Sequence, residues 1–436
     1  MSGSMTQLAA QGQQSSAVTG MDYTPFKTVV RRVTAFSTEP KVVQFNGTTD
    51  FNKVAQCHIP RTADLLSKIW LVIETDPISE TTHSTGDMKH YKAVEDVARG
   101  MIEYITLEAG SITYQTIYPE WLVIKEELST TSEKIDLDLT GKPDRNTGTS
   151  QAARFRELPY KKNRFYVQIP FWFSRTYGHA LPIVNLHLTE ITIKIKMKAK
   201  TDVIISNAGV GTGEFTNGLT GSSKAPGTPA ALSSSDFAIN QMYLLGEYIY
   251  LSDNERTSFA TNQHAYLIEQ VQTHTETIAA NSTSHVAKLQ FNHPCKAFYW
   301  YGIKKDNKDA KNWLDWSGYE DGKTGFAPAN SLFETAKISL NNNTRVMALG
   351  PKYYGTIQPQ QHHTRIPTCN VYMYSFALAP ENVQPSGNLN CSRIETISLE
   401  LKFSTSFDKT IDLTVIAENY NIVRIGNGIS MLSWAS

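Results

Sequence analysis

One stretch of the sequence alternates strictly between apolar and polar side chains: Ile191-Thr192-Ile193-Lys194-Ile195-Lys196-Met197-Lys198-Ala199-Lys200. Successive side chains of a β-strand point to opposite faces, so this period of two places the isoleucines on one face and the lysines on the other. An α-helix would scatter both sets around its axis. The stretch therefore predicts a β-strand with one buried face and one face in contact with water.

A second alternating stretch near the C-terminus places four apolar residues on one strand face: Ile397, Leu399, Leu401 and Phe403. Residues 104–114 are expected to form a hairpin that turns at Ala109-Gly110. From Phe26 onward short strand-like runs recur, and no rhythm of strands alternating with long amphipathic helices is visible. A short helix is expected over Asp253–Thr261, with Asp253 as its N-cap. The sequence thus predicts an all-β protein in two units joined near residues 253–265.

Composition argues against a protein that binds nucleic acid directly. The chain has 436 residues, with 41 Lys and Arg against 41 Asp and Glu, so its formal net charge is +0. Proteins that bind nucleic acid usually carry a basic excess that displaces phosphate counterions. The first twenty residues contain no charged side chain at all. This neutral segment cannot bury enough apolar surface to fold alone, and we expect it to order against a neighbour.

Targeting signals are not apparent. Apolar runs such as Ile69–Ile73 are far shorter than the roughly 18 residues of a membrane span, and the N-terminus lacks the pattern of a signal peptide. The cysteines follow no framework spacing and are expected to be free thiols: Cys57, Cys295, Cys369 and Cys391. Four Asn-x-Ser/Thr sequons would be modified only in a secretory pathway, so we expect them to be incidental: Asn46, Asn281, Asn342 and Asn390.

No motif for catalysis, a cofactor or a metal is complete. His362-His363 and Cys369 lie near one another in the sequence, but no CxxC or HxxxH spacing completes a metal site. Glu103 and Glu108 would suit a glycosidase only if they faced each other across a cleft, and we expect them instead on the wet face of the predicted hairpin. We therefore expect no enzyme, no bound cofactor and no metal.

Several longer motifs occur in one order along the chain. The first is Ile169-Pro170-Phe171-Trp172-Phe173, the second is Tyr248-Ile249-Tyr250-Leu251-Ser252-Asp253-Asn254-Glu255-Arg256, and the third is Tyr374-Ser375-Phe376-Ala377-Leu378 followed by Pro380-Glu381. With these motifs the chain resembles the major capsid proteins of large eukaryotic nucleocytoplasmic DNA viruses, of the chlorella-virus and iridovirus type. The resemblance implies two consecutive eight-stranded antiparallel jelly rolls with short helices in their loops.

The resemblance also implies a domain plan. Residues 1–24 would be an N-terminal arm, residues 25–262 the first jelly roll, and residues 263–436 the second. The Gly, Ser and Thr-rich stretch 206–236 would be a long outward loop of the first roll.

A role in a virus particle follows from the same resemblance. Three chains would form a pseudo-hexagonal capsomer, and many capsomers would tile the icosahedral shell of a large double-stranded DNA virus. Implied partners are neighbouring capsomers, minor capsid proteins and penton proteins, with the arm facing an internal membrane. Synthesis and assembly would take place in the host cytoplasm.

Two other classes of function remain as alternatives. A carbohydrate-binding β protein could stack sugars on loop aromatics such as Trp313, Trp316 and Tyr319, although aromatic side chains more often serve local packing. A glycoside hydrolase would show turnover and lose it when one carboxylate is replaced. The multi-residue matches favour the shell protein over both.

Overall fold

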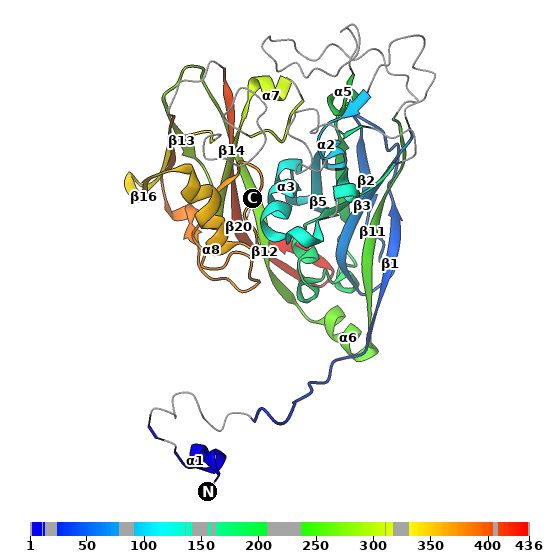
Figure 1. The fold of residues 1–436 in the computed structure, drawn as a ribbon. Helices are drawn as coiled ribbons and strands as arrows, with labels where there is room; N and C mark the ends of the chain where they lie inside the picture. The colour runs from blue at the N-terminus through cyan, green and yellow to red at the C-terminus, as the bar shows by residue number, and fades with distance from the viewer. Residues whose placement is uncertain are drawn as a thin grey trace. The chain divides into compact units, whose positions relative to one another are not determined.

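The structure, a computed structural model, describes residues 2–10, 12–13, 24–77, 91–135, 137–141, 156–157, 163–206, 237–309, 311–316, 331–403 and 409–434. It divides into two units, residues 1–36 and 37–436, and the β-sheets form in the second unit (Figure 1). In the first unit, helix α1 (Gly3–Ala9) buries none of its residues. The predicted loop 206–236, apart from Ser206, lies outside the described residues, and so does Tyr319.

The first half of the second unit contains two four-stranded sheets. In spatial order, sheet A consists of β1 (Phe36–Gln44), β11 (Ile239–Leu251), β3 (Leu65–Thr75) and β8 (Asn163–Ile169). Sheet B consists of β2 (Val54–His58), β9 (Ile191–Met197), β5 (Ile102–Ala109) and β6 (Ile112–Ile117), again in spatial order. A small additional sheet joins β10 (Ile204–Ser206), β4 (Tyr91–Ala93) and β7 (Arg156–Glu157).

The second half contains another pair of sheets. Sheet D consists, in spatial order, of β12 (His264–Ile278), β20 (Ile411–Gly426), β14 (Pro294–Lys304) and β17 (Tyr372–Ser375), with β18 (Leu389–Asn390) and β21 (Ile429–Leu432) attached. Sheet E consists of β13 (Ser284–Leu289), β19 (Ile397–Lys402), β15 (Thr335–Leu340) and β16 (Asn343–Leu349).

The two halves repeat one topology. When the eight main strands of each half are numbered along the chain, sheets A and D both have the spatial order 1-8-3-6, and sheets B and E both have the order 2-7-4-5. Two facing antiparallel sheets connected in this way form a jelly roll. The predicted fold class, two consecutive eight-stranded antiparallel jelly rolls, is confirmed, although no internal sequence repeat stands out.

Short helices lie in the connections between strands, as predicted. They are α2 (Val97–Gly100), α3 (Pro119–Ser129), α4 (Leu137–Thr140), α5 (Lys200–Val203), α6 (Asp253–Thr261), α7 (Lys305–Asp309) and α8 (Gln358–His362). Helix α6 has the predicted bounds, but its N-cap is Ser252 and not Asp253, because the backbone is still extended at Ser252. Within the described part of the chain, no helix is long and apolar enough to cross a membrane.

The two alternating stretches form strands as predicted. In β9 the four apolar residues are buried, and in β19 Leu401 is fully buried while Lys402 is exposed. On the other face of β9, Lys194 pairs with Glu108 at 2.7 Å and Lys196 pairs with Glu103 at 3.0 Å. The two glutamates therefore sit on the wet side of the hairpin as cross-strand partners of lysines. The strand ends at Met197, earlier than the pattern suggested, because α5 begins at Lys200.

The core consists of two large clusters of buried side chains. One lies between sheets D and E. The other fills the first jelly roll and continues onto the outward face of sheet D, where it includes Tyr299, Tyr301 and Ile416. Strands β14 and β20 are thus buried on both faces, with alternate residues such as Phe298 and Trp300 pointing into the other cluster. Sheet D is therefore the layer that the two jelly rolls share.

Replacing Leu401 with Ala is expected to lower the free energy of unfolding by about 2–5 kcal/mol, because it leaves a cavity in a dry core. The matched control is Val286→Ala on β13 of the same sheet, a side chain that is 50% exposed, for which a change of about 0.5 kcal/mol or less is expected. Denaturant unfolding followed by tryptophan fluorescence measures both. Equal losses for the two variants would contradict the assignment of this face to the core.

Candidate functional site

The junction between the two jelly rolls is the most elaborate polar site of the described chain. Helix α3, in the connection between β6 and β8, lies against the outward face of sheet D. Its Trp121 ring meets Tyr299 edge-on at 5.3 Å between centroids. Pro119 opens the helix, a position where its missing N–H costs nothing. The helix buries residues on several sides, including Leu122, Val123 and Ile124, as expected of a helix held between two layers.

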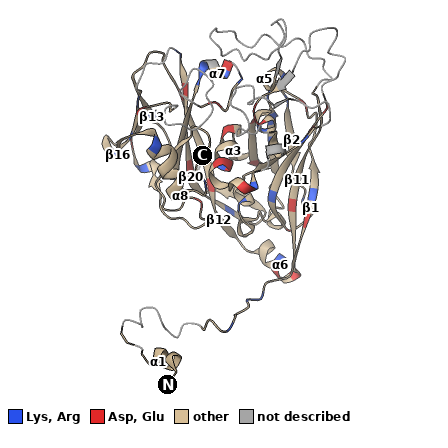
Figure 2. Ribbon diagram, in the orientation of Figure 1, with Lys and Arg blue, Asp and Glu red and all other residues tan. Residues whose placement is uncertain are grey.

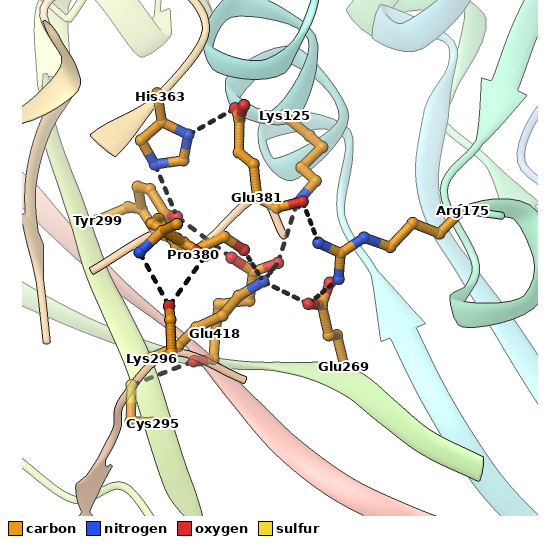
Figure 3. Close-up of polar contacts among 12 residues, drawn as sticks. Lys125, Arg175, Glu269, Cys295, Lys296, Tyr299, His363, Pro380, Glu381 and Glu418 are labelled. Atoms are coloured by element: carbon orange, nitrogen blue, oxygen red, sulfur yellow. Dashed lines mark hydrogen bonds and ion pairs between the residues drawn. The ribbon is translucent and has the colours of Figure 1, made fainter. Parts of the chain in front are cut away.

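A lysine lies at the centre of this junction (Figure 3). The side chain of Lys296, on β14, is 0% exposed, and its Nζ contacts three acceptors: Glu269 Oε1 at 2.6 Å, Pro380 O at 2.9 Å and Glu418 Oε1 at 3.1 Å. Burial lowers the pKa of Lys296, against the opposing effect of Glu418. Three acceptors match the three N–H groups of an ammonium, so the site holds the charged form.

Glu418, on β20, connects the two jelly rolls. Its Oε1 accepts from Lys125 of α3 at 3.0 Å, and its Oε2 accepts from the Tyr299 hydroxyl at 3.2 Å. Burial alone would raise the pKa of Glu418, but the ammonium groups of Lys125 and Lys296 outweigh burial and hold that pKa well below its ordinary value. The carboxylate is therefore ionised and bonded to a cation from each roll.

Arg175 adds a second cation from the first roll. Its guanidinium donates to Glu269 on β12 and to the carbonyl oxygen of Glu381. Beside these groups lies a cavity of about 540 Å³ lined by Lys125, Arg175, Glu269 and Glu418 among others. We call Lys125, Arg175, Glu269, Lys296 and Glu418 the ionic cluster. Its three cations and two carboxylates come from both jelly rolls.

Next to the ionic cluster, the end of α3 is tied to the connection that precedes β17. Glu127 Oε2 accepts from the Arg365 guanidinium and from Thr368 Oγ1 at 2.8 Å. Further along, His363 Nδ1 donates to Glu381 Oε1 at 2.8 Å. Burial lowers the pKa of His363 despite this bond, so a neutral imidazole is the donor. Each of these contacts satisfies a buried charge or a buried polar atom.

The chain segment that joins the two rolls is fixed at both ends of α6. Arg256 Nε donates to Asp64 Oδ1 at 2.8 Å, and Asp64 Oδ2 accepts from the backbone N–H of Leu251 at 2.8 Å. Asn185 Nδ2 donates to the carbonyl oxygens of Phe259 and Asn262. The motif that carried the family resemblance, which ends at Arg256, thus holds the connector in place.

The residues that the sequence offered as possible metal ligands do not form one site. His362 Nδ1 bonds to the carbonyl oxygen of Leu378, whereas His363 bonds to Glu381, and Cys369 is buried. Across the described residues, no three His, Cys, Asp or Glu side chains gather in a way that could hold a metal ion. All four sequon asparagines are exposed: Asn46, Asn281, Asn342 and Asn390.

The loop aromatics serve packing. Trp316 is buried and stacks on Tyr301 at 4.4 Å, and Trp313 donates its ring N–H to the carbonyl oxygen of Glu95. Burial and stacking make Trp316 inaccessible to a sugar, and Lys198 Nζ lies over the Trp313 ring, 5.1 Å from its centroid.

Local sequence pattern did not predict the ionic cluster. One available signal was the nearly continuous apolar run Ala297-Phe298-Tyr299-Trp300-Tyr301, which is typical of a strand buried on both faces. A charged residue next to such a run, in this chain Lys296, needs a buried partner. The identity of that partner, 122 positions away in Glu418, could not be read from local pattern.

Replacing Lys296 with Met is expected to lower the free energy of unfolding by about 3–5 kcal/mol, because the buried Glu418 and the half-buried Glu269 lose their shared ammonium. The control is Lys337→Met, which removes a surface pair with Glu400 whose side chains are 35% and 46% exposed; a loss of about 0–1 kcal/mol is expected there. Both values come from denaturant unfolding at one protein concentration. If the two variants are equally stable, the ionic cluster does not stabilise the fold in the way described.

The stability of the protein should also depend on Glu381. Burial would raise the pKa of this carboxyl, but bonds from His363 and Thr364 lower it from 4.5 to about 2. A lowered pKa means that the carboxylate stabilises the fold above about pH 4.5 and loses this contribution as the pH falls toward 2. Glu381→Gln should therefore unfold at a lower temperature than the unchanged protein at neutral pH, and the difference should shrink below pH 4.5.

Thermal unfolding midpoints at a series of pH values measure this difference. Glu400→Gln, which removes half of an exposed pair with Lys337, is the control and should differ little from the unchanged protein at any pH. A difference for Glu381→Gln that stays constant through the acid range would refute the role given to its carboxylate.

Comparison with known proteins agrees with the two-roll architecture. Residues 24–252 match the family described as major capsid protein N-terminus, and residues 255–431 match the family described as large eukaryotic DNA virus major capsid protein. The chain is 30% identical over 463 aligned residues to the major capsid protein of Pyramimonas orientalis virus and 29% identical over 479 to that of Paramecium bursaria Chlorella virus 1. Both alignments cover 100% of each chain.

Solved structures agree in fold. A chain from the PBCV-1 virus capsid superposes with a TM-score of 0.74 at 25% identity, covering 95% of this chain and 100% of that one. The Faustovirus major capsid protein superposes with a TM-score of 0.71 at 12% identity, covering 93% of each chain. With both halves matched by family, and relatives aligned from end to end, this chain belongs to the major capsid proteins of large eukaryotic DNA viruses.

Proposed function

We propose that this protein forms homotrimeric, pseudo-hexagonal capsomers that tile the icosahedral shell of a large double-stranded DNA virus. The observation that carries the proposal is the repeated strand order of sheets A and B in sheets D and E. Two similar rolls per chain give six similar walls per trimer, so a threefold assembly can fill a nearly sixfold position. The junction described above would hold the two rolls of each chain in a fixed relative orientation when neighbouring capsomers contact them.

The proposed domain plan is an arm over residues 1–24, a first roll over 25–262 and a second over 263–436. Support comes from the strands, because sheets A and B end with β11 at Leu251 and sheets D and E begin with β12 at His264. The stretch 206–236, rich in Gly, Ser and Thr, is proposed as an outward loop of the first roll.

The arm is proposed to face the particle interior near an internal membrane, without direct contact with nucleic acid. Its first twenty residues carry no charge, and the whole chain has a net charge of +0. Figure 2 shows Lys and Arg interspersed with Asp and Glu along the described part of the second unit. Minor capsid proteins, penton proteins and neighbouring capsomers are the proposed partners.

A purely structural role is proposed, with no catalytic activity. The most strongly perturbed titratable groups often mark active sites, yet in this chain Lys296 and Glu418 are bonded to each other and to further fixed partners. Synthesis and assembly are proposed to occur in the host cytoplasm. The sequons at Asn46, Asn281, Asn342 and Asn390 would then remain unmodified.

The mass of the purified protein in solution tests the proposal. Size exclusion with light scattering should give a stable species of about 146 kDa, three copies of the 48.7 kDa chain. Imaging of concentrated samples should then show hexagonal arrays. A stable monomer at every concentration would overturn the trimer, and binding to a glycan array would point to the carbohydrate-binding alternative instead.

A further inference from the structure

The outward face of sheet A has the same place in the first jelly roll as the outward face of sheet D in the second. Both sheets have the strand order 1-8-3-6. The face of sheet D is covered by α3 and carries Ile416, Tyr299 and Met373 side by side on neighbouring strands. The outward face of sheet A presents partly exposed apolar groups within the described part of residues 37–436 (its β1 and β11 lie at the right-hand margin of Figure 1).

Two rows of side chains make up the middle of this face. One row is Tyr243, Val72 and Tyr166, and the other is Leu245, Trp70 and Gln168. Val72 is 0% exposed although it belongs to no core cluster, because its cross-strand neighbours are the two tyrosines. Tyr166, Tyr243, Trp70 and Leu245 are half-buried. Neither row contains a charged residue.

A helical segment of the second roll corresponds to α3. Both follow the fifth strand of their roll: α3 comes after β6, and residues 351–362, the π-helical turn η9 (Tyr353–Ile357) with α8, come after β16. Their openings align as Ile117-Tyr118-Pro119-Glu120-Trp121 and Leu349-Gly350-Pro351-Lys352-Tyr353. In each case a proline starts the helix two residues after the strand, and an aromatic residue follows two positions later.

In this alignment, the side chains of α3 that contact sheet D correspond to side chains of segment 351–362 that are half-buried or exposed. Trp121 corresponds to Tyr353, which is half-buried, and Lys125 corresponds to Ile357, which is 42% exposed. The next exposed residues of the segment are Gln360 and Gln361. An exposed isoleucine and neutral amides suit the uncharged rows of sheet A, whereas Lys125 suits Glu418 on sheet D. Around Ile357 the two contacts thus agree in charge as well as in topology.

We propose that the outward face of sheet A binds the helical segment 351–362 of a second copy of this chain. The contact between copies would repeat the contact between the two rolls of one chain, so that it continues the established junction around the trimer. This inference rests on the proposed function, because it names the surfaces through which the trimer forms. The partner is a second copy and not another protein, since the helix that covers the equivalent face of sheet D belongs to this chain.

The test compares three variants with the same introduced charge. Leu245→Glu and Ile357→Glu each place a carboxylate in the proposed contact, and Leu188→Glu places one on an apolar side chain that is 69% exposed in a loop outside it. Light scattering should show that the first two fall from three copies to one copy of the chain, while Leu188→Glu stays trimeric. Circular dichroism and the thermal midpoint establish that each variant is folded.

A second measurement applies to variants that fold poorly. Leu245→Cys and Ile357→Cys are combined in one chain and treated with a short bis-maleimide; the four native cysteines are buried, so background reaction is low. Covalent dimers and trimers on a denaturing gel support the proposal, and either single cysteine variant should give none.

The outcomes separate this inference from the proposed function. If the unchanged protein is trimeric, and both glutamate variants stay trimeric without cross-linking of the cysteine pair, the trimer exists but uses other surfaces, and the inference is wrong. If the unchanged protein is monomeric at every concentration, the proposed function itself fails.

Discussion

The packing of the first jelly roll on the outward face of sheet D is the contact on which the rest of the structure depends. Strands β14 and β20 lose water from both faces, because one face lies against sheet E and the other against α3. Nearly every residue of β14 is buried, including the large side chains of Tyr299 and Trp300. Exposing one face of this sheet would expose aromatic surface on the scale of a domain core, at roughly 25 cal/mol per Å² of apolar area. The two rolls therefore form one continuous packed body within residues 37–436.

The ionic cluster in this contact is better explained as a device that fixes the position of one roll on the other than as a source of stability. Charges removed from water cost several kcal/mol each, and a well-packed apolar pair is often at least as stable. Apolar surfaces, however, can slide on one another, whereas Glu418 must lie between Lys125 of one roll and Lys296 of the other. Displacement of α3 by a few ångströms would leave a buried carboxylate without its cation. We infer that the cluster fixes the register of the rolls, as single buried polar residues do in coiled coils.

The sequence predicted those parts of the fold that local pattern controls. Alternation identified β9 and β19, and the apolar–polar rhythm together with the family resemblance led to two jelly rolls. The N-cap of α6 was misplaced by one residue, because Ser252 and Asp253 are both good caps and only the backbone angles distinguish them. The junction was not predicted, since Lys296 meets Glu418 through the pairing of β14 with β20 and Lys125 meets Glu418 through the packing of α3 on sheet D, both across more than a hundred residues. The strand order common to both halves leaves no repeat in the sequence, because a buried β core constrains alternation and volume more than residue identity.

A chain with two such rolls makes one contact between a helix and a sheet face internally, the contact of α3 with sheet D. One further sheet face and one further helix of the same kind take no part in that contact. One of these surfaces is the outward face of sheet A, whose middle rows are partly exposed among the described residues, and the other is the helical segment 351–362. Surfaces of this type are head-to-tail, so repeated copies form either a closed ring or an open filament, depending on the rotation per contact. A rotation near 60° per roll closes after six rolls, that is after three chains. In the proposed trimer, the stiffness of the internal junction would serve ring closure as well as stability, because only a fixed angle between the rolls of one chain would let the contact between chains close the ring.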